Sequence, residues 1–506
     1  MSASHTESLA KATRLTPLTP AARLVATSLA CLILALLGCS LFMEPLGHDE
    51  FQHLFLAWNN AQGERLYVDT FDTHGPLFTL INTVVFSLTG PPAGAEVYTL
   101  FRAGSLLALL GIATMVFRAA GHLTHNTRTA YLAGFLFLTL TPILNKGIEI
   151  RPDVLQNLLW MMCVALVATD LDTKDQRRYG VAGLLLGLAG ATNTKAALGA
   201  LALGCFFLVQ LAFEPTRRRE RCTAYVTLIL ASLTGFALVY VPFVFSGTVA
   251  EALHYTLVAP FYLAGHHDMG EMPSLWPVLT TTHALFTMSA YIGFYQLFKG
   301  QAAVTATHSR FLVLLTLITT FGTLQVGHSQ ILLISLPLLS IVAAVGLQWC
   351  LTQCSTDIIR WIAVFAVLIP GPALHTSMLI DSYTQREAQN QLLEHTLSNL
   401  SRDEIIGTVW SNCGGYSFNP SSRFLWMGNY SAWLSEQMYQ HGQGDRQQFK
   451  QEERLHLEDE RVRTVIARMN TYHSRDLGEE TQRYLTEHFT QSHEACLWTR
   501  KPAPMD

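Results

Sequence analysis

The sequence predicts a mostly α-helical, polytopic membrane protein with about 11 transmembrane helices and a small C-terminal α/β domain. Half of its 506 residues are hydrophobic and only 14% are charged, whereas soluble globular proteins carry about 25% charged residues. The charges are also unevenly distributed, because 31 of the 70 charged residues lie within residues 381–506. This pattern is typical of a membrane-embedded body that ends in a water-soluble domain.

The first apolar run extends from Leu24 to Met43 and is long enough to cross the ~30 Å hydrocarbon core of a bilayer. It follows Lys11, Arg14 and Arg23, and no clean small-residue cleavage site follows it. We therefore expect an uncleaved signal anchor behind a cytoplasmic tail of residues 1–22.

Ten further apolar runs predict a transmembrane domain over residues 23–380. They lie at residues 97–117, 129–145, 154–169, 180–194, 196–213, 223–246, 277–297, 311–324, 331–350 and 359–379. With the N-terminus inside, the inner segments carry fifteen Lys and Arg residues and the outer segments carry five. This bias agrees with the positive-inside rule and, with an odd number of spans, predicts an outer C-terminal domain. We expect a bacterial inner membrane with a periplasmic domain, because endoplasmic reticulum retention signals are absent.

The C-terminal domain, residues 381–506, shows the alternating periodicities of an α/β fold. Helical periodicity covers residues 383–400, and residues 479–489 are again amphipathic. Residues 404–409 predict a short strand, and the segment 459–467 ends in a short apolar run. Residues 496–500 predict a last strand at the edge of the sheet. Cys413 and Cys496, the two cysteines of this domain, can pair if it faces an oxidising compartment.

Composition and pattern also weigh against several functional classes. A net charge of −4 provides no basic surface for nucleic acid. A transporter or lipid flippase stays the main alternative, but it requires ionisable residues deep in several spans and commonly shows internal repeats. The predicted spans are nearly free of charge, and no repeat is apparent. A receptor-like protein would instead use the tail, where Trp410, Tyr416, Trp426 and Tyr430 either stack on sugars or pack in a core.

The first outer loop, residues 44–95, contains an unusual concentration of acids, histidines and aromatic residues. Asp49 and Glu50 begin an amphipathic helical segment, and His53 shares a face with Asp49 because the two are four residues apart. The apolar face of this segment suits the membrane interface. Carboxylates beside lipid are costly and therefore candidates for function, although a helix N-terminus also favours acids through its dipole.

The outer end of the fourth predicted span reads Lys146-Gly-Ile-Glu149-Ile-Arg151-Pro152-Asp153. Proline and aspartate suit the first turn of a helix. An arginine at the outer end of a span, however, runs against the positive-inside bias. Arg151 is therefore a candidate for an anion-binding role.

In order and spacing over residues 20–380, the chain resembles the GT-C superfamily of polytopic glycosyltransferases, in particular the protein O-mannosyltransferase and lipid A aminoarabinose transferase branch. The tail resembles the small outer domains of many bacterial members. The resemblance is carried by Asp49-Glu50, by Gly63, Tyr67 and Asp69 in the pattern G-x-x-x-Y-x-D, by His74-Gly75-Pro76-Leu77, by Arg151-Pro152-Asp153, by the glycine-containing run that ends at Lys195, and by His328 before Leu336-Pro337.

The resemblance implies transfer of a sugar from a polyprenyl-phosphate carrier to an acceptor hydroxyl at the outer membrane face, with inversion of the anomeric centre. The acceptor would be a lipid, a glycan or a protein of the cell envelope. The implied catalytic residues are Asp49 as general base, Glu50 and Asp153. The implied donor phosphate-binding residues are Arg151, His74, Lys195 and His328. The implied acceptor or sugar-binding residues are His53, Tyr67, Asp69 and Glu149.

In aminoarabinose transferases a lysine commonly precedes the proline pair of the first outer loop, where this chain has His74-Gly75-Pro76. A phosphate contact by His74 would therefore depend on its protonation, and a local turn cap is the alternative for this residue.

We expect no required divalent metal, because related members are metal-independent. The Asp69-x-x-Asp72 pair suits loop capping. The outer loop 247–276, which carries His254, His266, His267, Asp268 and Glu271, suits a gate or an acceptor surface better than a metal site.

Overall fold

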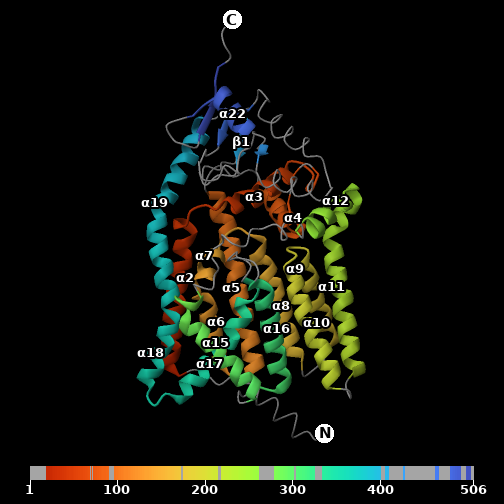
Figure 1. The fold of residues 1–506 in the computed structure, drawn as a ribbon, viewed down its shortest axis with the longest axis vertical. Helices are drawn as coiled ribbons and strands as arrows, with labels where there is room; N and C mark the ends of the chain where they lie inside the picture. The colour runs from red at the N-terminus through yellow and green to blue at the C-terminus, as the bar shows by residue number, and fades with distance from the viewer. Residues whose placement is uncertain are drawn as a thin grey trace. The chain divides into compact units, whose positions relative to one another are not determined.

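The computed structural model describes the greater part of the chain, and helices dominate it (Figure 1). The described residues are 19–68, 70, 72–89, 96–171, 175–214, 218–260, 279–300, 304–324, 333–399, 405–409, 425–427, 462–466, 479–491 and 497–502.

The chain divides into two compact units. The first unit comprises Met1–Phe42, Arg102–Pro242 and Met269–Leu379. The second comprises Met43–Phe101, Phe243–Asp268 and Ile380–Asp506.

Seven helical stretches in the described part of the chain are long and apolar enough to cross a membrane. They belong to α2 (Pro20–Met43), α5 (Glu96–Thr124), α8 (Pro152–Asp170), α10 (Ala196–Phe213), α11 (Arg218–Ser246), α17 (Leu336–Gln353), and α18 (Asp357–Leu368) continued by α19 (Pro370–Asn399). The predicted class, a mostly α-helical polytopic membrane protein, is confirmed.

Helices also occupy the other four predicted spans. They are α6 (Thr127–Leu138) with the short α7 (Thr141–Lys146), α9 (Gln176–Gly190), α15 (Ala284–Lys299) and α16 (Ala306–Leu324). The α9 helix has 15 residues, which at about 1.5 Å per residue gives about 22 Å, less than the ~30 Å hydrocarbon core. The count of eleven spans stays a prediction.

Within the first unit, α15 and α17 pack closely through glycines. A side-chain carbon on Gly293 would collide with the carbonyl of Val342, and one on Gly346 would collide with the carbonyl of Ser289. Small residues allow backbones of membrane helices to approach in this way. The same α17 also packs against α6, so that it lies in the core of the unit, and Leu336 to Leu347 are largely buried.

In the second unit, α3 (His48–Ala61) and α4 (Pro76–Thr89) form a helical hairpin. The Thr83 hydroxyl donates to the Ala57 carbonyl at 3.2 Å, and the Trp58 ring meets Phe86 edge-on at 5.5 Å. In the described part of the connection, Leu66 and Thr70 form a bridge. Pro76 begins α4, where its missing N–H is not needed. The unit also contains α12 (Val249–Leu253) and the π-helical turn η2 (His254–Val258).

The C-terminal part of the second unit contains a five-stranded sheet of order β2-β1-β3-β5-β4 and the helix α22 (Glu479–His488). The strands are β1 (Ile405–Val409), β2 (Leu425–Met427), β3 (Val462–Ile466), β4 (Phe489–Gln491) and β5 (Leu497–Arg500). Strand β1 is parallel to β2 and β3, whereas β5 is antiparallel to β3 and β4. The predicted mixture of helices and strands is therefore present.

One prediction for the sheet is wrong. The last strand, β5, does not lie at the edge, because β4 pairs with its free side. Strand β4 has three residues and directly follows α22, so its sequence pattern is indistinguishable from the end of that helix.

Candidate functional site

The α3 helix begins with a cap beside Asp49. Its N-cap is Gly47, whose backbone is extended, and the fully buried Glu50 carboxylate accepts the Gly47 N–H at 2.8 Å. Asp49 is the second residue of the helix and is half-buried. Glu50 thus closes the helix terminus as in a capping box, which gives it a structural contact beside the predicted base.

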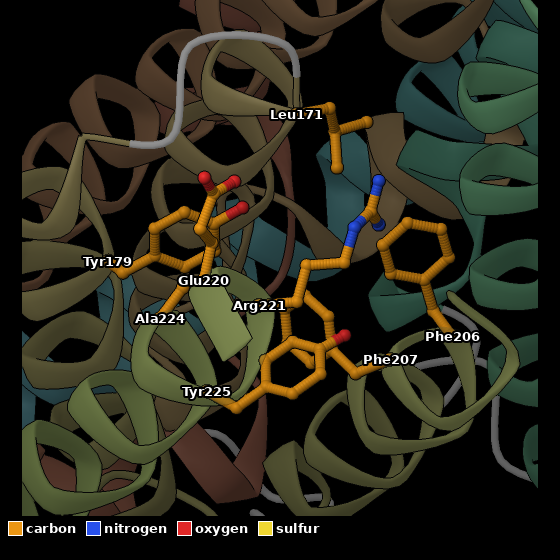
Figure 2. Close-up of a pocket in the computed structure, with 8 residues that line it drawn as sticks. All are labelled: Leu171, Tyr179, Phe206, Phe207, Glu220, Arg221, Ala224 and Tyr225. Carbon is orange, nitrogen blue, oxygen red and sulfur yellow. The ribbon is translucent and has the colours of Figure 1, made fainter. Parts of the chain in front are cut away.

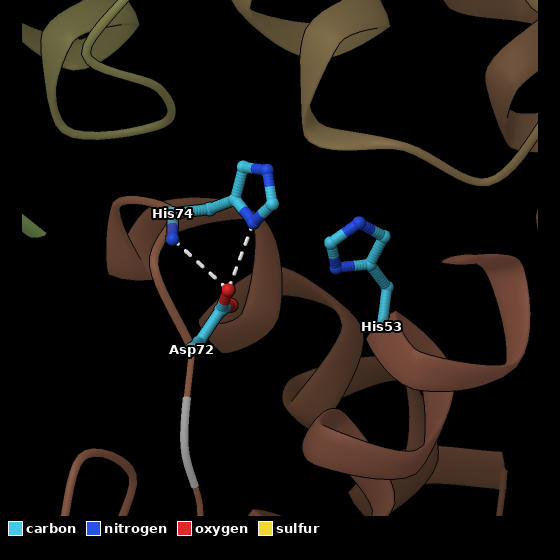
Figure 3. Close-up of side chains that lie close together, drawn as sticks. All are labelled: His53, Asp72 and His74. Atoms are coloured by element: carbon cyan, nitrogen blue, oxygen red, sulfur yellow. Dashed lines mark hydrogen bonds and ion pairs between the residues drawn. The ribbon is translucent and has the colours of Figure 1, made fainter. Parts of the chain in front are cut away.

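His53, from α3, meets Asp72 and His74, from the connection between α3 and α4 (Figure 3). The Asp72 carboxylate is fully buried, and its Oδ1 lies 2.8 Å from Nδ1 of His74 and accepts the His74 backbone N–H at 2.9 Å. The His53 ring is buried and meets the His74 ring edge-on, with centroids 5.0 Å apart. Figure 3 shows all three side chains converging on one point.

Two opposing effects act on the acidity of Asp72. Burial raises its pKa, but the charge of His74, the hydrogen bonds from His74 and the charge of His53 together outweigh burial. The pKa of Asp72 is therefore below its ordinary value of 3.8. The carboxylate form is the one that the two histidines stabilise.

Tyr67 holds this connection in place. Its backbone has a φ of 69°, in the left-handed region that few non-glycine residues adopt. Its N–H donates to the Thr70 carbonyl at 2.8 Å, and its hydroxyl donates to the His74 carbonyl at 2.6 Å. The ring is buried and stacks with Tyr255. These contacts position His74.

A second cluster of charged side chains lies in the first unit, at the start of α8. Arg151 is the N-cap residue of α8, and Pro152 and Asp153 form its first turn as predicted. The Arg151 guanidinium donates to Glu149 at 3.2 Å and has its Nε 3.6 Å from Oδ2 of Asp153. The Arg151 and Asp153 side chains are 7% and 1% exposed.

Lys195 completes this cluster from the start of α10. Its Nζ lies 2.6 Å from Oδ1 of Asp153. Asn193 donates to the same Asp153 oxygen at 3.3 Å and also accepts the Lys195 backbone N–H at 3.1 Å. The carboxylate of Asp153 therefore holds two cations in fixed positions.

Lys146, at the end of α7, pairs with Glu149 at 2.5 Å and extends the cluster. We name the five charged residues Lys146, Glu149, Arg151, Asp153 and Lys195 the arginine network. Three cations and two carboxylates give it a net charge of +1. Such an arrangement suits an anionic ligand, because the carboxylates hold the cations in fixed positions before the ligand binds.

The structure brings the predicted site residues together in two groups. Glu149, Arg151, Asp153 and Lys195 meet in the first unit. In the second unit, α3 carries Asp49, Glu50 and His53, and Tyr67 and His74 lie in the connection that follows. Asp69, His328, His266, His267, Asp268 and Glu271 lie outside the described residues, as do Cys413 and Cys496. The convergence of Asp49 with Arg151 and Asp153 stays a prediction.

Two residues of these groups are not among the predicted site residues. The sequence pattern assigns Asp72 to loop capping, and its spacing of two from His74 is the signal that could have paired them. Asn193 precedes Lys195 by two residues, and such a spacing is typical of an amide that caps a helix start.

A small cavity of ≈ 10 Å³ lies within the first unit (Figure 2). It is lined by Leu171, Tyr179, Phe206, Phe207, Glu220, Arg221, Ala224 and Tyr225. The Arg221 guanidinium donates to Gln210 at 2.6 Å and pairs with Glu214. A cavity of this size holds about one water molecule, so it cannot admit a sugar or a lipid headgroup.

Comparisons with known proteins bear on both groups of residues. The family model of dolichyl-phosphate-mannose-protein mannosyltransferases matches residues 73–245, a span that includes His74 and the whole arginine network. The search of curated proteins finds no match.

Solved structures share the fold over nearly the whole chain. ArnT from Cupriavidus metallidurans bound to undecaprenyl phosphate is 12% identical, with a TM-score of 0.64 over 95% of this chain and 98% of that one. The Archaeoglobus fulgidus oligosaccharyltransferase in its apo form is 11% identical, with a TM-score of 0.56 over 94% of this chain and 75% of that one. The same archaeal enzyme, AglB, with an inhibitory peptide and a dolichol-phosphate, is 10% identical, with a TM-score of 0.52 over the same shares.

The predicted resemblance is thus confirmed by a sequence match and by the fold. The chain has the fold of these membrane glycosyltransferases, and its residues 73–245 are similar to the mannosyltransferase family.

Proposed function

We propose that this protein transfers a sugar from a polyprenyl-phosphate carrier to an acceptor hydroxyl at the outer face of a bacterial inner membrane. The arginine network, in which Arg151 and Asp153 are buried and Lys195 is 23% exposed, is the observation that carries the proposal. The polyprenyl phosphates bound to ArnT and to AglB support the choice of donor. The N-terminus would be cytoplasmic and the C-terminal domain periplasmic.

In the proposed reaction, the acceptor oxygen attacks the anomeric carbon and the bond from this carbon to the phosphate oxygen breaks. The configuration inverts in this single displacement. The leaving group is a phosphate monoester, which is stable as an anion and needs cations more than it needs a proton donor. Arg151 and Lys195 would supply them, since the planar guanidinium fork matches phosphate oxygens. His74 and His328 are further proposed phosphate contacts.

Asp49 would accept the proton of the acceptor hydroxyl. It is half-buried at the second position of α3, and the Glu50 cap fixes the start of that helix. Asp153 would serve the reaction by holding Arg151 and Lys195 in place. His53, Tyr67, Asp69 and Glu149 are the proposed residues on the acceptor or sugar side, with Tyr67 acting through the loop that it supports.

Replacing Asp49 by Asn tests the proposal. We expect Asp49→Asn to fold in membranes but to lose about 10²–10⁴-fold in transfer rate from an undecaprenyl-phosphate sugar, because the amide cannot accept the proton. Transfer would be measured with purified protein in detergent or vesicles. Asp357→Asn is the matched control, since the Asp357 side chain is 83% exposed. Full activity of Asp49→Asn would reject Asp49 as the base.

A further inference from the structure

The group of His53, Asp72 and His74 has the composition of a metal site. Each residue offers one ligand atom, and the three atoms lie within 4.8 Å of one another. Figure 3 shows them facing one another across a short gap, from α3 on one side and from the connection before α4 on the other. The resemblance of the sequence to metal-independent transferases predicts no such site.

The three side chains differ in burial, so an ion would reach the group from the side of the most exposed one. The His53 and Asp72 side chains are almost completely buried, and the His74 side chain is 25% exposed. An ion held by all three would therefore have two ligands from the interior and one from the accessible side. Three protein ligands leave a fourth position open, as in zinc sites that also bind water or an anionic oxygen.

The chemistry of the ligands selects the kind of ion. Imidazole nitrogens suit zinc and neighbouring transition metals, whereas magnesium and calcium prefer oxygen ligands alone. Zinc imposes no strong geometric preference and accepts two histidines and one carboxylate. A group of two imidazoles and one carboxylate therefore favours Zn²⁺.

Neighbouring groups hold the ligands in position, as metal sites require. The Asp72 Oδ1 accepts the His74 backbone N–H, and the Thr79 hydroxyl lies 3.4 Å from Oδ2. The Tyr67 hydroxyl holds the His74 carbonyl at 2.6 Å. Phe78 packs edge-on against the His53 ring, with centroids 5.6 Å apart. Asp72 and His74 already contact each other without His53. The buried His53 imidazole adds the third ligand atom and gives the group the composition of a metal site.

We propose that His53, Asp72 and His74 bind one Zn²⁺ ion in the first outer loop of this protein. The inference does not depend on the proposed function, because metal binding is measured without a sugar donor.

The experiment uses the full chain in detergent, purified through a tag without histidine and stripped of metal with a chelator. Titration with Zn²⁺ and elemental analysis should give one equivalent more in the wild type than in His53→Ala or Asp72→Asn. Co²⁺ should give the visible absorption of a four-coordinate nitrogen and oxygen site in the wild type and lose it in both variants. Affinity should fall at least about tenfold in each, since even second-shell changes cost about 10–100-fold.

His254→Ala is the matched control, because His254 belongs to the same unit and is not one of the three ligands. It should bind zinc as the wild type does. His53→Gln provides a milder change if His53→Ala does not fold, as judged by circular dichroism and gel filtration. A wild type that binds no zinc overturns the proposal, and so does equal zinc content in the wild type and the folded His53 and Asp72 variants.

Discussion

Two buried carboxylates, Asp153 in the first unit and Asp72 in the second, have different partners. Asp153 is 1% exposed and contacts the permanent cations Arg151 and Lys195. Asp72 is fully buried and contacts His74, with His53 nearby. A buried carboxylate needs charge compensation in either case, but guanidinium and ammonium groups cannot bind a metal, whereas neutral imidazoles can.

The difference between the partners of the two carboxylates indicates which ligand each group suits. The arginine network pairs its carboxylates with guanidinium and ammonium groups, which donate hydrogen bonds to phosphate oxygens, and it therefore suits a phosphate. The group of His53, Asp72 and His74 offers lone pairs and therefore suits a cation. Two similarly buried carboxylates thus belong to sites for ligands of opposite charge. The residues that contact each carboxylate decide whether the site suits an anion or a cation.

Among the variants that test this comparison of the two groups, Arg151→Lys should have the largest effect. The change keeps the charge of the network but removes the planar fork. We expect transfer from an undecaprenyl-phosphate sugar to fall about 10²-fold or more, with weaker donor binding, measured by kinetics and by titration with undecaprenyl phosphate. Lys195→Arg, which keeps the charge and adds donors, is the control and should lose less. Unchanged donor affinity in Arg151→Lys would reject its phosphate role.

The next effect comes from His74→Lys, which gives the second unit a permanent cation like those of the first. We expect zinc affinity to fall at least about tenfold, because an ammonium has no lone pair. Affinity for undecaprenyl phosphate should rise several-fold, because a lysine is ordinarily protonated near neutral pH, whereas an imidazole is ordinarily neutral there. Calorimetric titration with each ligand checks the two signs. Zinc binding at wild-type strength would show that His74 is not a ligand.

The smallest effect comes from Tyr67→Phe, which removes the hydroxyl that holds the His74 carbonyl. We expect a loss of about 1 kcal/mol in the free energy of local opening, measured by hydrogen exchange of the amides around Tyr67. Exchange within α17, in the other unit, serves as the internal control and should not change. Equal protection of the loop in variant and wild type would mean that the hydrogen bond contributes nothing.

The fold was largely predictable because its determinants are local and repeated. Apolar runs predicted helices at every expected span, and the run at residues 404–409 predicted β1. The edge of the sheet was not predictable, since β4 is three residues long and its pairing with β5 is decided at a distance.

The candidate site was predictable in its residue types but not in its partnerships. Arg151 and Asp153 are recognisable from their position at a helix start, where proline and the helix dipole leave a clear signal. The contact of Lys195 with Asp153 joins residues 42 apart in the chain, and no periodicity encodes it. Asp72 looks like a simple cap in the sequence because its contact with His53 depends on α3, which brings that ring from a separate segment.

The backbone at Tyr67 has a consequence for protein engineering. Glycine is the residue that most easily adopts a φ near 69°, so a stability-guided redesign would select the substitution Tyr67→Gly for its lower conformational strain. That choice would remove both the ring that stacks on Tyr255 and the phenol that restrains His74. A substitution that lowers backbone strain in this turn would therefore leave His74 less restrained. Variants of Tyr67 should be selected for stability and for binding at the same time.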